Sequence, residues 1–429
     1  MTDKNLFEYF LKQKEMVLIL RLSTIGMAWH GMAWHGKKPD CPSSAHYAAR
    51  SQKINGRIWR NSMLDNTPAT RLSGMTLQNG WIVGDILVVG RAQEGGEGSG
   101  GTFSVSYVVT KEGKTAFLKA FDLDNVLKKR GNRSLMETLQ QETTAFNNEK
   151  GLNTLCVKSR MRQIVKIIDH GDVTVPSEHG DMVNEIPYMV MELADGGDVR
   201  SYLKQTSLHD LSVKFRYLKE IALGISQLHA EKISHQDIKP SNVMIFEEAG
   251  AKIGDLGRAS VQGIVGVYDG WVIAGDQGYA PPEQLYGLTL NEWVDRRERC
   301  DLYQFGSIIS FLMFGVTVNT ILHERLPQEV SPRRWGGGHS TYAQALPYLQ
   351  KAFYEGLEEY ERSLPSWLGS RIVNLIEQCS NPDYNKRGAK SVLGKNNFLG
   401  LGFNRFVSEL DYLRNEADRQ SIIAAKRQA

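Results

Sequence analysis

The sequence has few cysteines, and none of them are closely spaced. The 429 residues contain four cysteines and no C-x-x-C pair. Four scattered cysteines are not typical of a disulfide framework or a thiolate zinc site. We therefore expect reduced thiols and a cytoplasmic protein.

Long apolar runs and a large excess of one charge are also missing. The longest apolar stretch, residues 308–318, is shorter than the ~18–20 residues that cross a membrane, so no membrane span is expected. The first residues are partly acidic, which argues against a secretory signal. The formal net charge is only +3, whereas nucleic-acid binding needs a clustered basic patch. We expect no nucleic-acid partner.

Residues 1–79 differ from the rest and are predicted to form an N-terminal extension of unknown role. They contain a tandem pentapeptide, GMAWHGMAWHG, followed by a basic stretch rich in Ser and Asn. A metal site could be read into one set of residues: His30, His35, Cys41 and His46. Their intervals fit no zinc motif, so a local duplication explains the repeat better.

From Gly80 the pattern becomes that of an α+β protein with two lobes. Apolar and β-branched runs predict strands, punctuated by glycine, at 81–89, 103–109, 115–121, 164–168 and 187–193. A helix is expected over 137–155. After residue 197 apolar residues recur every three or four positions, as in the predicted helix 215–228.

The strongest chemical signal is HQDIKPSN at residues 235–242, followed by an Asp-Leu-Gly triplet. It supplies Asp237, Lys239 and Asn242, and Asp255 begins the triplet. This order matches the kinase pattern H-R-D-x-x-x-x-N and D-F-G. Over residues 80–400 the chain resembles the eukaryotic-like Ser/Thr protein kinases, and GDQGYAPPE resembles their bacterial members.

The resemblance implies a bilobal protein-kinase fold and the use of ATP and Mg²⁺. Residues 80–194 would form the N-lobe and hinge and 195–400 the C-lobe, with 401–429 as a helical tail. Asp237 would orient and deprotonate the substrate hydroxyl, and Lys239 would neutralise charge at the γ-phosphate. Asn242 and Asp255 would be the metal ligands.

Nucleotide-binding residues are expected before the catalytic loop. A G-x-G-x-x-G pattern lies at Gly96, Gly98 and Gly101; alone it is equally typical of a flexible loop. A lysine in an apolar strand, Lys119, needs an anionic partner, and the family pairs it with a helix glutamate. Glu149 is favoured for this role, with Glu142 as the alternative.

The resemblance also predicts the hinge and the structural ion pairs. Met191 would be the gatekeeper, and backbone groups from Glu192 to Ala194 would pair with adenine. Asp198 is placed to bind the ribose. The family also has an ion pair here, between Glu283 and Arg387, and a carboxylate that braces the catalytic loop, Asp301.

The sequence departs from the family in its activation segment, residues 255–283. The arginine that usually precedes the catalytic aspartate is Gln236, which cannot pair with a phosphate by charge. The segment has no threonine, and its usual Gly-Thr is Gly275-Asp276. We therefore expect basal activity that does not depend strongly on phosphorylation of this segment.

The predicted function is an ATP-dependent Ser/Thr protein kinase that acts on a protein substrate, including autophosphorylation. Lys239 favours Ser/Thr over Tyr acceptors, although Asp276 leaves the acceptor open. A pseudokinase scaffold and a small-molecule kinase are the alternatives. Bacterial relatives also suggest a role in signalling, stress or phage defence.

Overall fold

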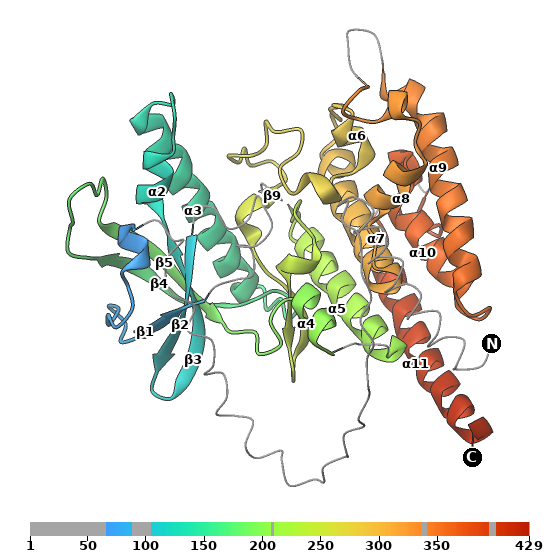
Figure 1. Ribbon diagram of the computed structural model, residues 1–429, viewed down its shortest axis with the longest axis horizontal. Helices are drawn as coiled ribbons and strands as arrows, with labels where there is room; N and C mark the ends of the chain where they lie inside the picture. Colours follow the sequence, from blue (N-terminus) through green and yellow to red (C-terminus); the bar gives the residue numbers. More distant parts are fainter. Residues whose placement is uncertain (1–65, 88–103, 207–209, 336–340, 394–399, 429) are drawn as a thin grey trace, which may run out of the picture. The chain divides into compact units, whose positions relative to one another are not determined.

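The computed structural model describes residues 66–87, 104–206, 210–335, 341–393 and 400–428. All of these described residues belong to one compact unit. Its first part is built on a sheet and its second part on helices (Figure 1). The prediction of an α+β fold with a strand-rich lobe and a helical lobe is confirmed. The histidines and the cysteine weighed above as a metal site lie outside the described residues.

The small lobe contains a five-stranded antiparallel sheet with strand order β1-β2-β3-β5-β4. Its strands are β1 (Ile82–Ile86), β2 (Ser104–Lys111), β3 (Lys114–Phe121), β4 (Ile167–Thr174) and β5 (Glu185–Glu192). Helices α2 (Leu123–Lys128) and α3 (Leu135–Lys158) follow β3, and α3 runs beside the sheet towards the large lobe (Figure 1). Each predicted strand overlaps one of these strands.

The alternation of β3 explains how a lysine is tolerated in an apolar strand. Ala116, Leu118 and Ala120 are fully buried on one face. Because successive side chains of a strand point to opposite faces, Lys119 lies on the other face. This face meets α3, which supplies its partner, Glu149.

The small lobe begins earlier than the predicted boundary at Gly80. Ala69, Leu72 and Leu77 are buried in the same hydrophobic cluster as the sheet. The buried Tyr107 of β2 donates its hydroxyl hydrogen to the carbonyl of Ala69, at 2.6 Å. The boundary is therefore corrected: the described residues from 66 onward belong to the lobe. The polar composition around these apolar residues concealed them.

The strand predicted at 164–168 is also corrected. Its first residue, Ile164, forms an isolated parallel bridge with Ile253 and is buried in the core of the large lobe. The sheet strand β4 starts only at Ile167 and continues through alternating polar residues. Their half-exposed positions explain why an apolar pattern missed them.

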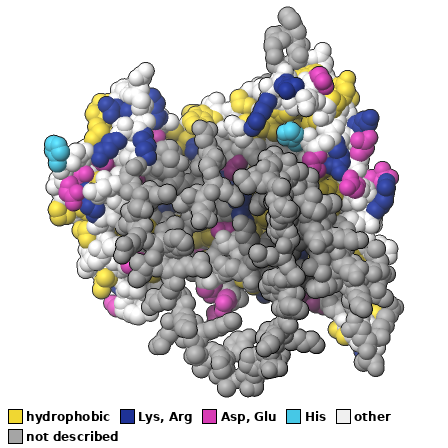
Figure 2. All heavy atoms as spheres, viewed as in Figure 1, with side chains coloured by type: hydrophobic (Ala, Val, Ile, Leu, Met, Phe, Trp, Pro, Cys, Tyr) yellow, Lys and Arg dark blue, Asp and Glu magenta, His cyan; other side chains and the backbone are white. Residues whose placement is uncertain are grey.

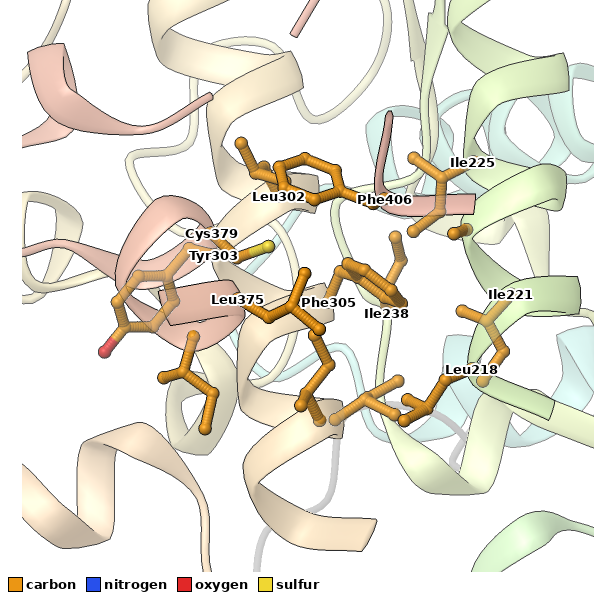
Figure 3. Packing of buried hydrophobic residues seen from close by; sticks show 14 of the residues in the cluster. Leu218, Ile221, Ile225, Ile238, Leu302, Tyr303, Phe305, Leu375, Cys379 and Phe406 are labelled. Carbon is orange, nitrogen blue, oxygen red and sulfur yellow. The ribbon is translucent and has the colours of Figure 1, made fainter. Parts of the chain in front are cut away.

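The large lobe is mainly helical. Its longer helices are α4 (Val199–Thr206), α5 (Leu211–Ala230), α7 (Arg299–Phe314), α8 (Val318–Arg325), α9 (Tyr342–Ser363), α10 (Gly369–Ser380) and α11 (Phe403–Gln428), with a short α6 (Pro282–Leu285). Figure 3 shows the core, where Ile221 of α5, Phe305 of α7, Leu375 of α10 and Phe406 of α11 converge. This packing fixes α5 and α7, between which the catalytic loop is held.

The predicted tail is the helix α11, which packs along α5 (Figure 1). Phe403, Phe406, Leu410 and Leu413 are buried and recur every three or four residues, as in an amphipathic helix. In the described part of the chain no single helix is long and apolar enough to cross a membrane. The segments Val294–Phe314 and Val318–Arg325 meet that test only together, across an 82° bend.

Candidate active site

The catalytic loop lies between two short strands of the large lobe. It begins after β6 (Ile233–Ser234) and ends in a 3-10 turn, η3 (Pro240–Asn242), which leads into β7 (Val243–Phe246). Strand β7 pairs with β8 (Gly250–Ile253) in a hairpin. The hairpin brings Asp255, just after β8, back to the loop: the backbone N–H of Gly254 donates to the carbonyl of Asn242 at 2.8 Å.

Asp301, in the first turn of α7, holds the start of this loop. Its carboxylate accepts hydrogen bonds from the backbone N–H groups of His235, at 2.8 Å, and Gln236, at 2.7 Å. It also accepts from the hydroxyl of Ser234, at 3.0 Å, and contacts the ring Nε2 of His229, at 2.8 Å. A fully buried carboxylate with four polar partners makes a rigid support for the loop.

Two non-glycine residues of the site have left-handed backbones, Gln236 with φ of 64° and Asp255 with φ of 62°. Such conformations are uncommon for residues with a Cβ and persist only where the surroundings impose them. At Gln236 these constraints are visible: Asp301 accepts from its N–H, and Gln304 donates to its carbonyl at 2.8 Å.

The carboxylate of Asp237 is the convergence point of the loop. It contacts Nζ of Lys239 at 3.0 Å and accepts from Nδ2 of Asn242 at 3.1 Å and from the backbone N–H of Asp276 at 2.8 Å. Burial raises the pKa of Asp237, and Lys239 opposes this shift. The three residues predicted from HQDIKPSN therefore lie together.

Asp276 adds a second carboxylate beside Lys239, at 3.4 Å. This approach depends on Gly275, because a Cβ there would lie 2.3 Å from the carbonyl oxygen of Gln236. The glycine lets the activation segment lie directly against the catalytic loop. Asp276 also caps the turn that follows, accepting from the N–H of Gly278 at 2.9 Å.

Lys119 joins the two lobes. Its Nζ lies 2.7 Å from Oε1 of Glu149 and 3.2 Å from Oδ1 of Asp255. Of the two glutamates left open by the sequence, the partner is Glu149; Glu142 has no ion pair to Lys119 among the described contacts. Burial opposes both charges, but the carboxylates raise the pKa of Lys119 and the lysine lowers that of Asp255. Both groups are therefore charged at neutral pH.

A comparison with known protein families identifies the family to which this arrangement belongs. Residues 93–398 match the protein kinase domain model, which covers well over half of the chain. The chain belongs to the protein kinase family. The kinase domain thus includes every element that forms the site.

Individual relatives match over shorter segments. The chain is 26% identical to a cAMP-dependent protein kinase catalytic subunit of Arthrobotrys oligospora over 52% of this chain and 37% of that protein. It is 33% identical to the probable serine/threonine-protein kinase PknB of Bifidobacterium longum, over 35% of this chain and 21% of that one. The mitosis inhibitor protein kinase wee1 of Schizosaccharomyces pombe is 31% identical over 50% of this chain and 22% of its own. The matches span about a fifth to two fifths of these relatives' lengths.

The kinase domain also contains the predicted ion pair behind the activation segment. Arg387 donates to both carboxylate oxygens of Glu283, at 2.7 and 2.6 Å, and both side chains are buried. The Nε of Arg387 donates to the carbonyl of Asn381 at 2.7 Å. Bidentate pairing of this kind fixes orientation as well as adding energy.

The hinge residues have partners that the sequence did not predict. Met191 is buried in an apolar cluster between the lobes. The N–H of Glu192 donates to the carbonyl of Lys166 at 3.0 Å, and its carboxylate pairs with Lys252 at 2.7 Å. The pairing of backbone groups from Glu192 to Ala194 with adenine stays a prediction.

Asp198, predicted to bind ribose, caps helix α4. Its carboxylate accepts from the backbone N–H of Ser201 at 2.9 Å and from its hydroxyl at 3.0 Å. This is the hydrogen-bonding pattern of an N-cap, and its role towards ribose stays a prediction. The glycines of the predicted phosphate loop, Gly96, Gly98 and Gly101, lie outside the described residues.

Sequence reasoning missed a residue that contacts both the catalytic loop and the activation segment. Arg297 is fully buried in η6, a π-helical turn (Val294–Glu298) before α7, and donates to the side chain of Gln236. It also contacts Asp269 of the activation segment. The only sequence signal is the Arg296-Arg297 pair ahead of an apolar helix.

Proposed function

We propose that the chain transfers the γ-phosphate of ATP to Ser or Thr hydroxyls of protein substrates. The observation that carries this proposal is the convergence of Lys239, Asn242 and the Asp276 N–H on the buried Asp237 carboxylate. Phosphoryl transfer depends mostly on positioning and electrostatics. Asp237 is held where it can orient a hydroxyl and accept its proton.

The nucleotide side supports the same proposal. Lys119 is held between Glu149 and Asp255 at 2.7 and 3.2 Å, so it is oriented to pair with ATP phosphates. Backbone groups of Glu192 and Ala194 in the hinge are proposed for adenine, and Asp198 for ribose. The gatekeeper Met191 would bound the adenine site from the apolar cluster.

The residues at the metal position suit Mg²⁺. Both hydrogen bonds from the Asn242 amide nitrogen go to Asp237, so its oxygen is the atom left to bind a cation. The carboxylate of Asp255 is kept ionised beside Lys119. Hard cations prefer these oxygen ligands, and a bound Mg²⁺ would neutralise phosphate charge during transfer. Asp255→Ala is expected to raise the Mg²⁺ concentration needed for half-maximal activity.

An acceptor panel tests the proposal. The purified chain is incubated with γ-labelled ATP and Mg²⁺ in three arms: a generic protein acceptor, a mixture of small alcohols and sugars, and no acceptor. Label in protein is expected, and in the chain itself if autophosphorylation occurs. ATP binding without transfer would identify a scaffold, and label confined to small molecules would identify a small-molecule kinase.

The acceptor residue is tested on the same labelled protein. Lys239 supports Ser/Thr chemistry, so acid hydrolysis should release phosphoserine or phosphothreonine. Recovery of phosphotyrosine alone would overturn this part of the proposal. Asp276→Thr provides a matched variant, because it restores the threonine usual in the family while Gly275 keeps the close approach.

A further inference from the structure

A buried cation joins the catalytic loop to the activation segment. The side chain of Arg297 is fully buried and always carries its charge. One terminal nitrogen donates to the side-chain oxygen of Gln236, the residue before Asp237. The other donates to the carbonyl oxygen of Asp269 at 2.9 Å and lies 3.5 Å from its carboxylate.

Gln236 is held by two residues that lie on neighbouring turns of one helical segment. Arg297 holds its side chain, and Asp301, four residues later, accepts from its backbone N–H at 2.7 Å. Its side-chain nitrogen donates in turn to the carbonyl of Arg258, at 3.2 Å. The side chain of Gln236 therefore links Arg297 to both the catalytic loop and the start of the activation segment.

The activation-segment side of the contact is also ordered. The second carboxylate oxygen of Asp269 accepts from the N–H of Gly266 at 2.7 Å, which closes a tight turn around the anion. Nearby, the guanidinium of Arg258 lies 4.2 Å from the ring centre of Tyr268 and 5.7 Å from that of Trp271. The turn therefore holds the Asp269 carboxylate in position independently of its contact with Arg297.

The hydroxyl groups of the segment are poorly placed to provide such an anion by phosphorylation. Ser260 and Tyr279 are buried, with exposed fractions of 4% and 6%. Tyr268 lies beneath Arg258. Asp269 already supplies a negative charge at the guanidinium.

We propose that Arg297 is a positioning residue for catalysis, with Asp269 as its built-in anionic partner. The pair holds the activation segment against the catalytic loop and, through Gln236, holds the backbone that carries Asp237. The effect on catalysis rests on the proposed kinase function, whereas the anchoring of the segment does not.

Asp269→Asn tests the proposal, since it keeps the shape and removes the charge. The residue is in a loop and partly exposed, so the variant is expected to fold. We expect kcat to fall about tenfold, the effect of ~1.4 kcal/mol on the barrier, while ATP affinity is unchanged because Lys119 and Asp255 are untouched. Asp269→Glu should restore most of the rate.

Amide hydrogen exchange gives a readout that needs no activity. Residues 260–276 should exchange faster in Asp269→Asn than in the native chain. Asp295→Asn is the control: it removes a carboxylate of a neighbouring ion pair, 2.8 Å from Arg299, and should leave both readouts unchanged. Arg297→Gln combined with Asp269→Asn should cost no more activity than Arg297→Gln alone.

Two results would overturn the proposal. One is an Asp269→Asn variant with native kcat and native exchange. The other is equal loss in Asp269→Glu and Asp269→Asn, which would indicate a steric effect. If the native chain transfers no phosphate at all, the kinase proposal fails, and the exchange comparison alone decides whether Arg297 and Asp269 anchor the segment.

Discussion

The catalytic loop of the large lobe and Lys119 of the small lobe are supported in different ways. The side chains of Asp237 and Lys239 are 2% and 1% exposed, and their loop is braced by Asp301 from within the same lobe. The side chain of Lys119 is 21% exposed and that of its partner Asp255 27%. Lys119 reaches Asp255 only across the boundary between the lobes.

The catalytic loop is therefore the preformed part of the site, whereas the contacts of Lys119 depend on the position of α3. The loop geometry follows from the packing of α5 and α7, which the core fixes. The position of Lys119 depends on where α3 places Glu149, so a movement of α3 would break it. We infer that substitutions in the loop change the chemical step, whereas those around Lys119 change assembly of the nucleotide site.

The largest loss is expected for Asp237→Asn. The amide keeps the shape but cannot accept the hydroxyl proton, so kcat should fall about 100-fold or more while ATP still binds. Steady-state rates and nucleotide titration measure the two effects. More than about a tenth of the native kcat, a loss below ~1.4 kcal/mol, would argue against this role.

The same carboxylate predicts a pH dependence. Burial raises the pKa of Asp237, and only the ionised form can accept a proton. As pH falls, kcat should therefore decline at a higher pH than expected for an ordinary aspartate. A pH profile of kcat at saturating ATP measures this limb. A decline no earlier than for an ordinary aspartate would show that another group limits the rate.

A smaller loss is expected for Glu149→Ala, with Glu142→Ala as its matched control on the same helix. Without Glu149, Lys119 retains Asp255 and loses its contact to α3. The rate should fall roughly tenfold or more, mainly through weaker use of ATP, and Glu142→Ala should be near native. A larger loss at Glu142 would reverse the assignment.

A modest effect is expected for Asp276→Ala. The variant loses the cap of the following turn, worth about 1 kcal/mol, and one of the two carboxylates beside Lys239. The N–H to Asp237 is retained, so the thermal midpoint should drop slightly and kcat should change by only a few fold. Thermal unfolding and initial rates test this. A loss as large as that of Asp237→Asn would place Asp276 in the chemistry itself.

Contiguous motifs made most of the site predictable from the sequence. The loop residues Asp237, Lys239 and Asn242 are close in the chain, and the pairing of Lys119 with Glu149 was implied by the resemblance to the kinase family. What escaped prediction was a contact between distant segments for which the family resemblance supplied no motif. The contact of Arg297 with Gln236 joins residues 61 apart, and neither residue type reveals its partner.

The fold was likewise predictable where the sequence shows a contiguous apolar pattern, and it was missed where no such pattern exists. Apolar alternation located four strands well, but β4 carries polar residues at its half-exposed positions. The segment from 66 to 79 contributes isolated apolar residues, such as Leu72, to the sheet core. Isolated residues produce no periodicity, so the domain boundary was placed too late.

The central claim is that the active arrangement is held by groups the chain itself carries, without a phosphate on the activation segment. Its most direct test is the initial rate of phosphatase-treated enzyme, recorded before it can rephosphorylate itself. The account predicts a full initial rate with no lag, and equally mild effects of Ser260→Ala and Tyr268→Phe. A lag that disappears on preincubation with ATP, and returns after dephosphorylation, would contradict it.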